Sequence, residues 1–302
     1  MAMIVGIRIL NFCGYTVGMI FGFLAVLYFF ISGRVSRRAS RQYLEHLHKV
    51  SPESGVAPTL KNVFLHHWHF GVNIIDRMYF WQGKLDRFRF TYEGRDKVFH
   101  YLNQGQGILM IGAHMGSFDA MRAFSHDKGL RVNVVMYRAH ARKFNFLLKK
   151  LNPTANLNVV EFEGSDMARI FELKEMLENG EVVAILGDRV APFGTPREHR
   201  ISFLGEPAPF PQNPWILAGL LGCPVFFANG VRKGRREYHI MVEPVAEQIV
   251  MPRKAREQQI RIYMSEYVTK LESLCKKHPF EWFNFYNFWP PVGSEPPETK
   301  GP

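Results

Sequence analysis

The sequence predicts an α/β protein with a mainly parallel central sheet, flanked by helices and preceded by an N-terminal membrane helix. Short apolar runs bounded by Gly, Pro or Asn recur between residues 107 and 231. Such runs are typical of strands that are covered on both faces. Helical patterns alternate with them, which predicts parallel strands joined by right-handed crossovers. A long stretch without charged residues precedes all of these elements.

The N-terminal stretch is the first predicted element. Residues 9–33 contain no charged side chain. A bilayer core of ~30 Å requires about 20 apolar residues in a helix, so this stretch is long enough to span. It is longer than the apolar region of a secretory signal, roughly 7–15 residues, and no Ala-x-Ala site follows it. We expect a retained transmembrane helix; a helix lying in the membrane interface is the alternative.

Charge predicts the side of the membrane on which the rest of the chain lies. Four arginines, Arg34, Arg37, Arg38 and Arg41, follow the apolar stretch, whereas only Arg8 precedes it. The positive-inside rule therefore places the remaining residues in the cytoplasm. The net charge of +11 favours an anionic membrane surface as a partner. We expect no nucleic-acid partner, because no zinc-finger, RNP or helix-turn-helix signature is present.

The chain is expected to divide into an anchor, residues 1–33, and one cytoplasmic domain, residues 34–302. The domain would comprise a helical lead-in (38–104), an α/β core (105–245) and a C-terminal helix with an aromatic tail (254–302). Strands are predicted at 107–113, 131–137, 158–162, 181–187 and 224–231, and a further strand at 236–243 would pair antiparallel with the last of these. Helices are predicted near 115–127, 140–151, 166–179, 212–222 and 254–277. In the helix at 212–222, Asn213 is the expected N-cap and Pro214 the first helical residue.

Polar residues follow several of the predicted strands. In open α/β sheets, ligands bind outside the carboxyl ends of the strands. The residues at those ends are His114, Arg138, Glu163, Asp188 and Arg189. A base, carboxylates and arginines thus converge on one rim, which predicts a substrate-binding site. Arg189 is equally a candidate for a structural ion pair.

His114 and Asp119 form an H-x4-D pattern at the end of the first of these strands. Gly112 and Gly116 flank the histidine and allow a tight turn. If Asp119 lies in the first turns of the following helix, its carboxylate can accept a hydrogen bond from Nδ1 of His114. Nε2 would then be free to take a proton from a hydroxyl and make it a nucleophile.

Other chemistry is less well supported by the sequence. His66, His67 and His69 are spaced like metal ligands, but an interfacial cluster of histidines and aromatic residues is the preferred interpretation. The three cysteines, Cys13, Cys223 and Cys275, are far apart, so neither a disulfide framework nor a metal site is indicated. No G-x-S-x-G motif of a serine hydrolase is present. Two alternatives to the activation of a hydroxyl nucleophile by His114 stay open: hydrolysis by an activated water, and lipid binding without catalysis.

These motifs together resemble the bacterial lipid A late acyltransferase family, of the lauroyl/myristoyl type, within the lysophospholipid acyltransferase superfamily. The resemblance covers most of the chain. It rests on the anchor and the segments at 36–38, 112–119, 135–138, 186–189, 203–208 and 279–289. It implies a glycerolipid acyltransferase-like fold, and transfer of a fatty acyl chain from a thioester, usually on acyl carrier protein rather than CoA, to a hydroxyl of a membrane lipid. No cofactor is expected.

The resemblance also implies roles for individual residues. His114 would be the base and Asp119 its partner, while Arg138 would bind a phosphate or the donor. Asp188 occupies the family's aspartate position in a Gly-Asp-x segment. The loop with Gly205, Glu206 and Pro207 would form part of the acyl or acceptor site. The expected location is the bacterial inner membrane.

Two positions differ from the usual pattern of lipid A enzymes. Those enzymes usually have glutamate at the position of Asp119, where aspartate is usual in glycerolipid acyltransferases. In place of an Asp-Gln-Asp type segment, this chain has Asp188, Arg189 and Val190. The acceptor therefore stays open between a lipid A-like lipid, a related glycolipid or aryl polyene-type lipid, and a lysophospholipid.

Overall fold

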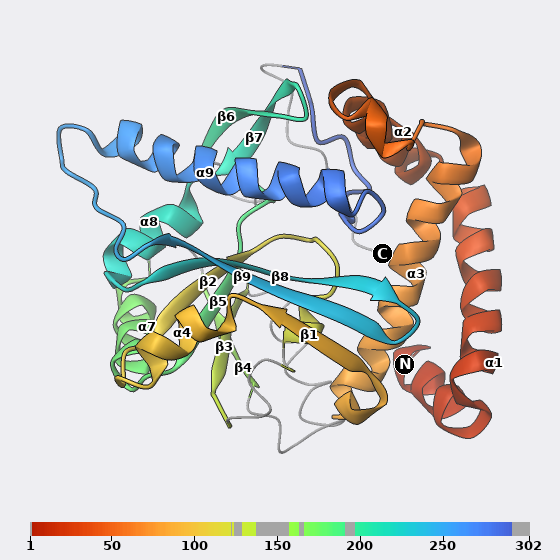
Figure 1. The fold of residues 1–302 in the computed structure, drawn as a ribbon, viewed down its shortest axis with the longest axis horizontal. Helices are drawn as coiled ribbons and strands as arrows, with labels where there is room; N and C mark the ends of the chain where they lie inside the picture. The colour runs from red at the N-terminus through yellow and green to blue at the C-terminus, as the bar shows by residue number, and fades with distance from the viewer. Residues whose placement is uncertain are drawn as a thin grey trace.

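The computed structural model describes residues 2–121, 123, 129–136, 157–162, 166–190 and 197–291. Within them, a seven-stranded sheet has the order β1-β9-β8-β2-β5-β3-β4 (Figure 1). The predicted α/β class with a mainly parallel sheet is confirmed. The strands are β1 (Arg89–Glu93), β2 (Ile108–Gly112), β3 (Val132–Met136), β4 (Leu157–Glu161), β5 (Val182–Leu186), β8 (Val225–Gly234) and β9 (Glu237–Ala246).

The centre of the sheet is parallel, and one antiparallel pair lies toward an edge. β2 is parallel to both β5 and β8, and β3 is parallel to both β5 and β4. β8 and β9 pair antiparallel, as predicted. Every residue of β2 is buried, which agrees with an apolar run covered on both faces.

β1 corrects the prediction that residues 38–104 form a helical lead-in and that the sheet begins only after them. This strand joins the edge of the same sheet, parallel to β9. Its residues alternate between exposed and half-buried. That period of two is typical of an edge strand, but five residues are too few to stand out within a helical region. The rest of the region contains the helices α2 (Arg34–Val50), α3 (Leu60–Trp81) and α4 (Arg95–Leu102).

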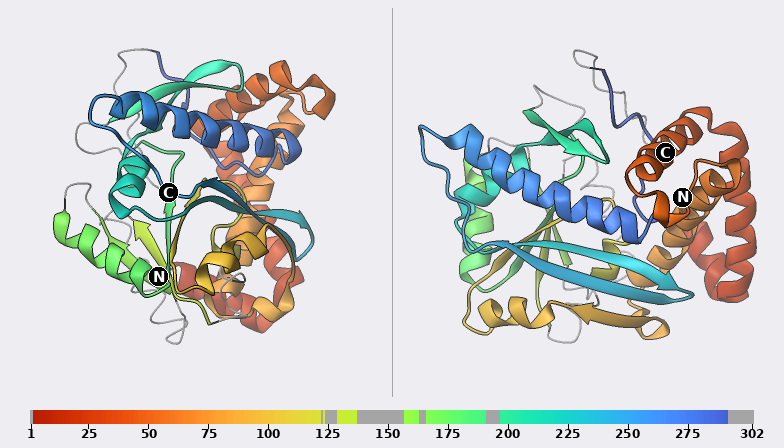
Figure 2. Two further views of the ribbon diagram at one scale, coloured as in Figure 1. Left: turned by 60° about the vertical axis from the view of Figure 1, so that its left-hand side comes forward. Right: turned by 45° about the horizontal axis from the view of Figure 1, so that its top comes forward.

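Helices cover both faces of the sheet (Figure 2). α9 (Arg256–Lys277) crosses one face, and α4 lies on the other (Figure 1). The helices predicted at 166–179 and 212–222 are present as α7 (Met167–Glu178) and α8 (Asn213–Leu221). Gln212, not Asn213, is the N-cap of α8. The helix predicted near 140–151 lies outside the described residues. Of the one predicted at 115–127, residues 115–118 form an extended loop and Asp119–Met121 a short 3-10 turn.

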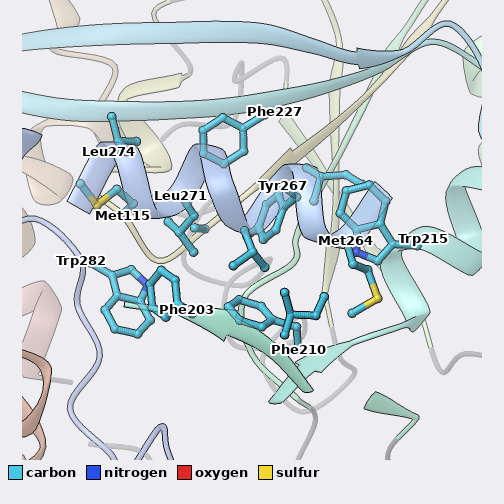
Figure 3. Close-up of a cluster of buried hydrophobic side chains, with 14 of the residues drawn as sticks. Met115, Phe203, Phe210, Trp215, Phe227, Met264, Tyr267, Leu271, Leu274 and Trp282 are labelled. Atoms are coloured by element: carbon cyan, nitrogen blue, oxygen red, sulfur yellow. The ribbon is translucent and has the colours of Figure 1, made fainter. Parts of the chain in front are cut away.

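A hairpin replaces the expected loop with Gly205, Glu206 and Pro207. It consists of β6 (Glu198–Phe203) and β7 (Glu206–Pro211), paired antiparallel. Leu204 and Gly205 connect the strands with φ of 51° and 86°. Two successive left-handed residues form the turn that suits the twist of a hairpin. Phe203 and Phe210 point from the hairpin toward Tyr267 and Leu271 of α9, so α9 is enclosed between the sheet and the hairpin (Figure 3).

The apolar N-terminal stretch forms α1 (Ala2–Ser32), which is interrupted at Gly14 (φ 78°, ψ 175°). The part from Gly14 to Ser32 is long and apolar enough to cross a membrane, judged by length and composition only. It lies beside α3 at one side of the sheet (Figures 1 and 2). The ring of Phe23 in α1 packs edge-on against Phe64 and Trp68 of α3.

Candidate active site

The register of two central strands brings His114 and Asp188 together. Gly112 at the end of β2 pairs with Leu186 at the end of the parallel neighbour β5. His114 and Asp188 each lie two residues beyond this pair. Parallel strands end at the same edge of a sheet, so residues at equal offsets become neighbours there.

Asp188 receives three hydrogen bonds from the protein. Nδ1 of His114 lies 2.8 Å from Oδ1. The backbone N–H of His114 donates to Oδ2 at 2.9 Å, and Nε1–H of Trp282 donates to the same oxygen at 3.1 Å. The carboxylate therefore holds both the ring and the backbone of His114. This arrangement corrects the expected geometry, in which Asp119 would have accepted the bond from Nδ1.

The ionisation of the pair suits a general base. Burial opposes ionisation of Asp188, but the contacts with His114 and Arg189 outweigh it and lower the pKa of the carboxyl to about 2. An ionised carboxylate only accepts, so Nδ1 of His114 carries the proton. Burial lowers the pKa of His114; Asp188 opposes this shift, and Arg189 and Arg77 add to it. The imidazole is thus neutral at neutral pH, and its side chain is 31% exposed while that of Asp188 is 1% exposed.

The backbone around His114 is fixed by neighbouring segments. The N–H of Ala113 donates to Oδ1 of Asn229 in β8, at 3.0 Å. The carbonyl of His114 accepts from the N–H of Phe283 at 2.8 Å. Gly116, with φ of 61°, lies directly against the backbone of Gly230, where no side chain would fit. β8 and the C-terminal aromatic segment therefore clamp the loop that carries the histidine.

Asp119 lies in the same loop but binds a different helix. Its Oδ2 is 2.7 Å from Nε of Arg77, and its Oδ1 accepts from Nε1–H of Trp81 at 2.6 Å. Both partners belong to α3. The Arg77 guanidinium also lies 5.8 Å from the Trp81 ring, and its side chain is 38% exposed. Asp119 thus places a partly exposed arginine on α3, close enough to His114 to lower the pKa of the imidazole.

Arg189 makes structural contacts next to the pair. Its NH2 group donates to the carbonyl of Phe283 at 2.7 Å, and its guanidinium lies 5.4 Å from the Tyr286 ring. These contacts link the β5 end to the aromatic tail. Its charge still acts on His114 and Asp188.

The remaining predicted site residues are not joined to His114 by the described contacts. Arg138 and Glu163 lie outside the described residues. Gly205, Glu206 and Pro207 form the tip of the β6–β7 hairpin. The hairpin approaches the site through another of its residues, Phe203, whose ring centroid is 5.1 Å from that of Trp282.

The sequence does not predict several contacts of the site. Trp282 donates a hydrogen bond to Asp188, and Asn229 accepts one from the backbone of Ala113, next to His114. Arg77 forms an ion pair with Asp119. Trp282 belongs to the predicted aromatic tail, but no local pattern indicates that its indole reaches Asp188. His114 and Asp188 each lie two residues beyond the end of a strand. These equal distances would predict their contact if the two strands were known to be neighbours.

The histidine cluster of α3 consists of rings with separate protein partners. His66 contacts Ser40 Oγ and the Trp282 carbonyl, each at 2.8 Å. His67 contacts the Val63 carbonyl at 2.8 Å, and His69 contacts Glu281 at 2.7 Å. Among the described residues, no group of three or more possible metal ligands comes together. The cluster therefore links α3 to α2 and to the C-terminal segment.

The fold and the site together define a class of protein: an α/β protein with a partly exposed histidine, bound to a buried aspartate, at the carboxyl edge of its sheet. The family model described as bacterial lipid A biosynthesis acyltransferase matches residues 65–290. The chain belongs to this family, and it is accordingly an acyltransferase of the lipid A type, which implies an acyl thioester donor and a lipid acceptor. No curated protein matches the chain significantly.

Proposed function

We propose that the protein transfers a fatty acyl chain from a thioester on acyl carrier protein to a hydroxyl of an envelope lipid, either lipid A-like or a related glycolipid or aryl polyene-type lipid. The observation that carries this proposal is the His114–Asp188 pair, with a neutral and partly exposed imidazole. Membership of the family supplies the class of reaction. The residues supply the base and the group that orients it.

The reaction begins with His114. Its Nε2 takes the proton of the acceptor hydroxyl as the oxygen attacks the thioester carbonyl carbon. Asp188 holds the proton on Nδ1 and stabilises the imidazolium that forms. When the tetrahedral intermediate collapses, the carbon–sulfur bond breaks and the imidazolium returns its proton to the departing thiolate. The products are an ester of the lipid and a free thiol.

Asp119 has an indirect role in this proposal. Its carboxylate is bound by Arg77 and Trp81, so it positions the Arg77 guanidinium beside the site. A planar cation suits recognition of phosphate or carboxylate groups. Many membrane lipids and both thioester carriers contain phosphate, so Arg77 is a candidate for binding either substrate. Arg138, Glu163 and the 205–207 tip stay candidates for substrate binding on the family resemblance alone.

The net charge supports acyl carrier protein as the donor, and the apolar helix α1 supports a location at the membrane. The net charge of +11 favours an acidic protein as donor, and acyl carrier protein is acidic. The apolar helix α1 supports attachment to a membrane, and we place the domain on the cytoplasmic side of the bacterial inner membrane, where acyl thioesters are made. Rates measured with acyl-ACP and with acyl-CoA at equal concentrations test the donor; faster turnover of acyl-CoA would contradict this choice.

A glycerolipid acyltransferase is the second candidate function. It is favoured by one observation, the aspartate at position 119 in the H-x4-D pattern. Incubation with acyl-ACP and either lysophosphatidate or a lipid A precursor distinguishes the two. Acylation of lysophosphatidate alone would replace the first proposal by the second.

The substitution His114→Ala tests the proposed base. Loss of general-base catalysis is expected to lower thioester turnover by about 10²–10⁴-fold. His100→Ala is the matched control, because His100 is an exposed residue of α4; its turnover should equal that of the wild type. Melting temperatures of both variants show whether the fold is retained. Normal turnover by a folded His114→Ala protein would remove this residue from the mechanism.

Lipid mass spectrometry of a deletion strain identifies the acceptor. A lipid that loses one acyl chain in the deletion strain, and also in the same strain carrying His114→Ala, is the expected product of this enzyme. If the wild-type protein binds lipid but never consumes a thioester, a non-catalytic role replaces the proposal.

A further inference from the structure

The first residue after the kink in α1 is fixed to the folded domain. Tyr15 is buried, and its hydroxyl donates to Oδ1 of Asp76 in α3 at 2.9 Å. The second oxygen of Asp76 accepts from Tyr238 of β9 at 2.7 Å. The guanidinium of Arg236, in the β8–β9 turn, lies 4.2 Å from the Tyr15 ring. The beginning of the apolar segment is thus bound both to α3 and to the sheet.

The end of the same apolar segment is fixed as well. Phe30 is buried, with ring centroids 5.2 Å from those of both Phe64 and His67 in α3. Arg37 of α2 donates to the carbonyls of Phe30 and Ile31. The last turn of α1 is therefore held by α2 and α3.

Between its ends, α1 approaches α3 closely at two glycines. A Cβ added to Gly22 of α1 would meet the side chain of Ile75, and one added to Gly71 of α3 would meet that of Val26. Small residues at such crossings let two helices pack tightly. The apolar segment thus lies along α3 over its whole length (Figures 1 and 2).

This packing is incompatible with α1 crossing the bilayer while the domain stays in water. If α1 spans in this position, α3 spans beside it, and Asp76, which binds Tyr15 at one end of the apolar segment, lies at the edge of the hydrocarbon. The arginines of α2 and those of the β8–β9 turn, at the two ends of α1, would then need opposite membrane surfaces, although they belong to one folded body. Charged groups inside a bilayer cost several kcal/mol each. A helix in the plane of the membrane avoids this cost.

The outward face of α1 has the composition of a surface that enters one leaflet. Among the described residues of α1, seven large apolar side chains are exposed: Ile20, Phe21, Phe23, Leu24, Tyr28, Phe29 and Ile31. The exposed basic residues Arg34, Arg38 and Arg41 of α2 follow directly. An apolar face bordered by basic residues binds an anionic membrane surface.

We infer that α1 docks in the plane of one anionic phospholipid leaflet and does not span the bilayer. Both ends of its apolar segment then lie at the same membrane surface as the domain. The inference is independent of the proposed acyl transfer. It replaces the transmembrane helix expected from length and charge by the interfacial alternative.

A disulfide between α1 and α3 tests whether this packing exists in membranes. The Cβ position built on Gly71 is 3.7 Å from Cβ of Val26, a distance typical of disulfides. With Cys13→Ser as background, the pair Val26→Cys and Gly71→Cys is expected to cross-link in isolated membranes under oxidation. The control pair, Leu24→Cys and Gly71→Cys, places the first cysteine on the exposed face and should not cross-link. Equal cross-linking of both pairs, or of neither, would overturn the inference.

Sidedness is measured with single cysteines at Thr16, near the start of the apolar segment, and at Glu45 in α2, the helix that follows its end. Both are exposed in the structure. An impermeant maleimide should label both from the cytoplasmic face in sealed inverted vesicles. Labelling of Glu45→Cys from that face and of Thr16→Cys only from the other face means that α1 spans, and the inference fails.

Vesicle flotation tests the charged border of the surface. Changing Arg34, Arg38 and Arg41 together to Gln should weaken binding to phosphatidylglycerol-containing vesicles by about 10²-fold, since each basic residue near such a surface contributes about 1 kcal/mol. The control changes Arg253, Lys254 and Arg256 to Gln. These exposed residues lie just before α9 and at its first residue, at the end of the molecule away from α1 (Figure 1). Equal weakening by both triple substitutions would overturn the placement of the docking surface.

Discussion

Two aspartates near His114 are held in different ways, one by the sheet and one by the helical layer. Asp188 follows β5 and binds Nδ1 of His114, which follows the neighbouring β2. Asp119 lies five positions after His114 in the chain, yet it binds Arg77 and Trp81 of α3. The partner of a residue at the end of a strand is thus set by the adjacent strand, and distance along the chain does not decide it.

The two contacts are alike in burial: in each, the aspartate is nearly buried and its partner is partly exposed. Asp188 is 1% exposed and its histidine 31%, whereas Asp119 is 7% exposed and its arginine 38%. The sheet region thus presents a partly exposed histidine whose aspartate is shielded from solvent. The helical region presents a partly exposed arginine whose aspartate is shielded in the same way. We expect the His114–Asp188 contact to govern the chemical step and the Arg77–Asp119 contact to govern substrate binding.

Asp188→Asn is expected to have the largest effect in this comparison. The amide can donate to Nδ1, which favours the tautomer with the proton on Nε2, and a protonated Nε2 cannot act as the base. Turnover should fall by about 10³–10⁴-fold, as for the corresponding change in a Ser-His-Asp triad. Steady-state kinetics should assign the loss to kcat, with the melting temperature measured in parallel. A loss confined to KM would contradict the role of Asp188.

Asp119→Asn should have a smaller effect, because its carboxylate acts through Arg77. We expect a roughly tenfold loss, about 1.4 kcal/mol in the barrier, that appears mainly in KM. A double-mutant cycle with Arg77→Gln should show that the two changes together cost little more than either alone. If Asp119→Asn lowers kcat as strongly as Asp188→Asn, or if the cycle is additive, Asp119 has another role.

Arg189→Gln is expected to have the smallest effect, on pH dependence. The charge of Arg189 helps to lower the pKa of His114, and the base is active only when neutral. The acid limb of the kcat/KM profile of the wild type should therefore lie below the ordinary histidine value of about 6.5. Removing the charge raises the pKa of His114 and moves this limb to higher pH. Arg189→Lys retains the charge and should leave the limb in place; a shift to lower pH in Arg189→Gln would contradict the assignment.

Much of the fold was predictable because its signals are local. β2 and β5 appear in the sequence as apolar runs, and α9 appears as a periodic pattern. Each pattern records which residues of that one segment are buried. β1 and the β6–β7 hairpin were missed for the same reason. β1 is half-exposed and β7 contains prolines, so each depends on pairing with an adjacent strand for stability. The residues of one segment do not show which strand lies beside it.

Local sequence patterns were enough to predict the α/β class, the position of His114 at the end of a strand, and a helix apolar enough to enter a membrane. Tertiary structure alone decided that Asp188 and not Asp119 binds the imidazole, because the order of strands in the sheet puts β5 beside β2. It also decided how α1 is oriented, since side chains from α2, α3 and the β8–β9 turn hold both ends of the apolar segment. Contacts between segments distant in the chain depend on packing free energy summed over the whole molecule, and no local pattern reports that sum.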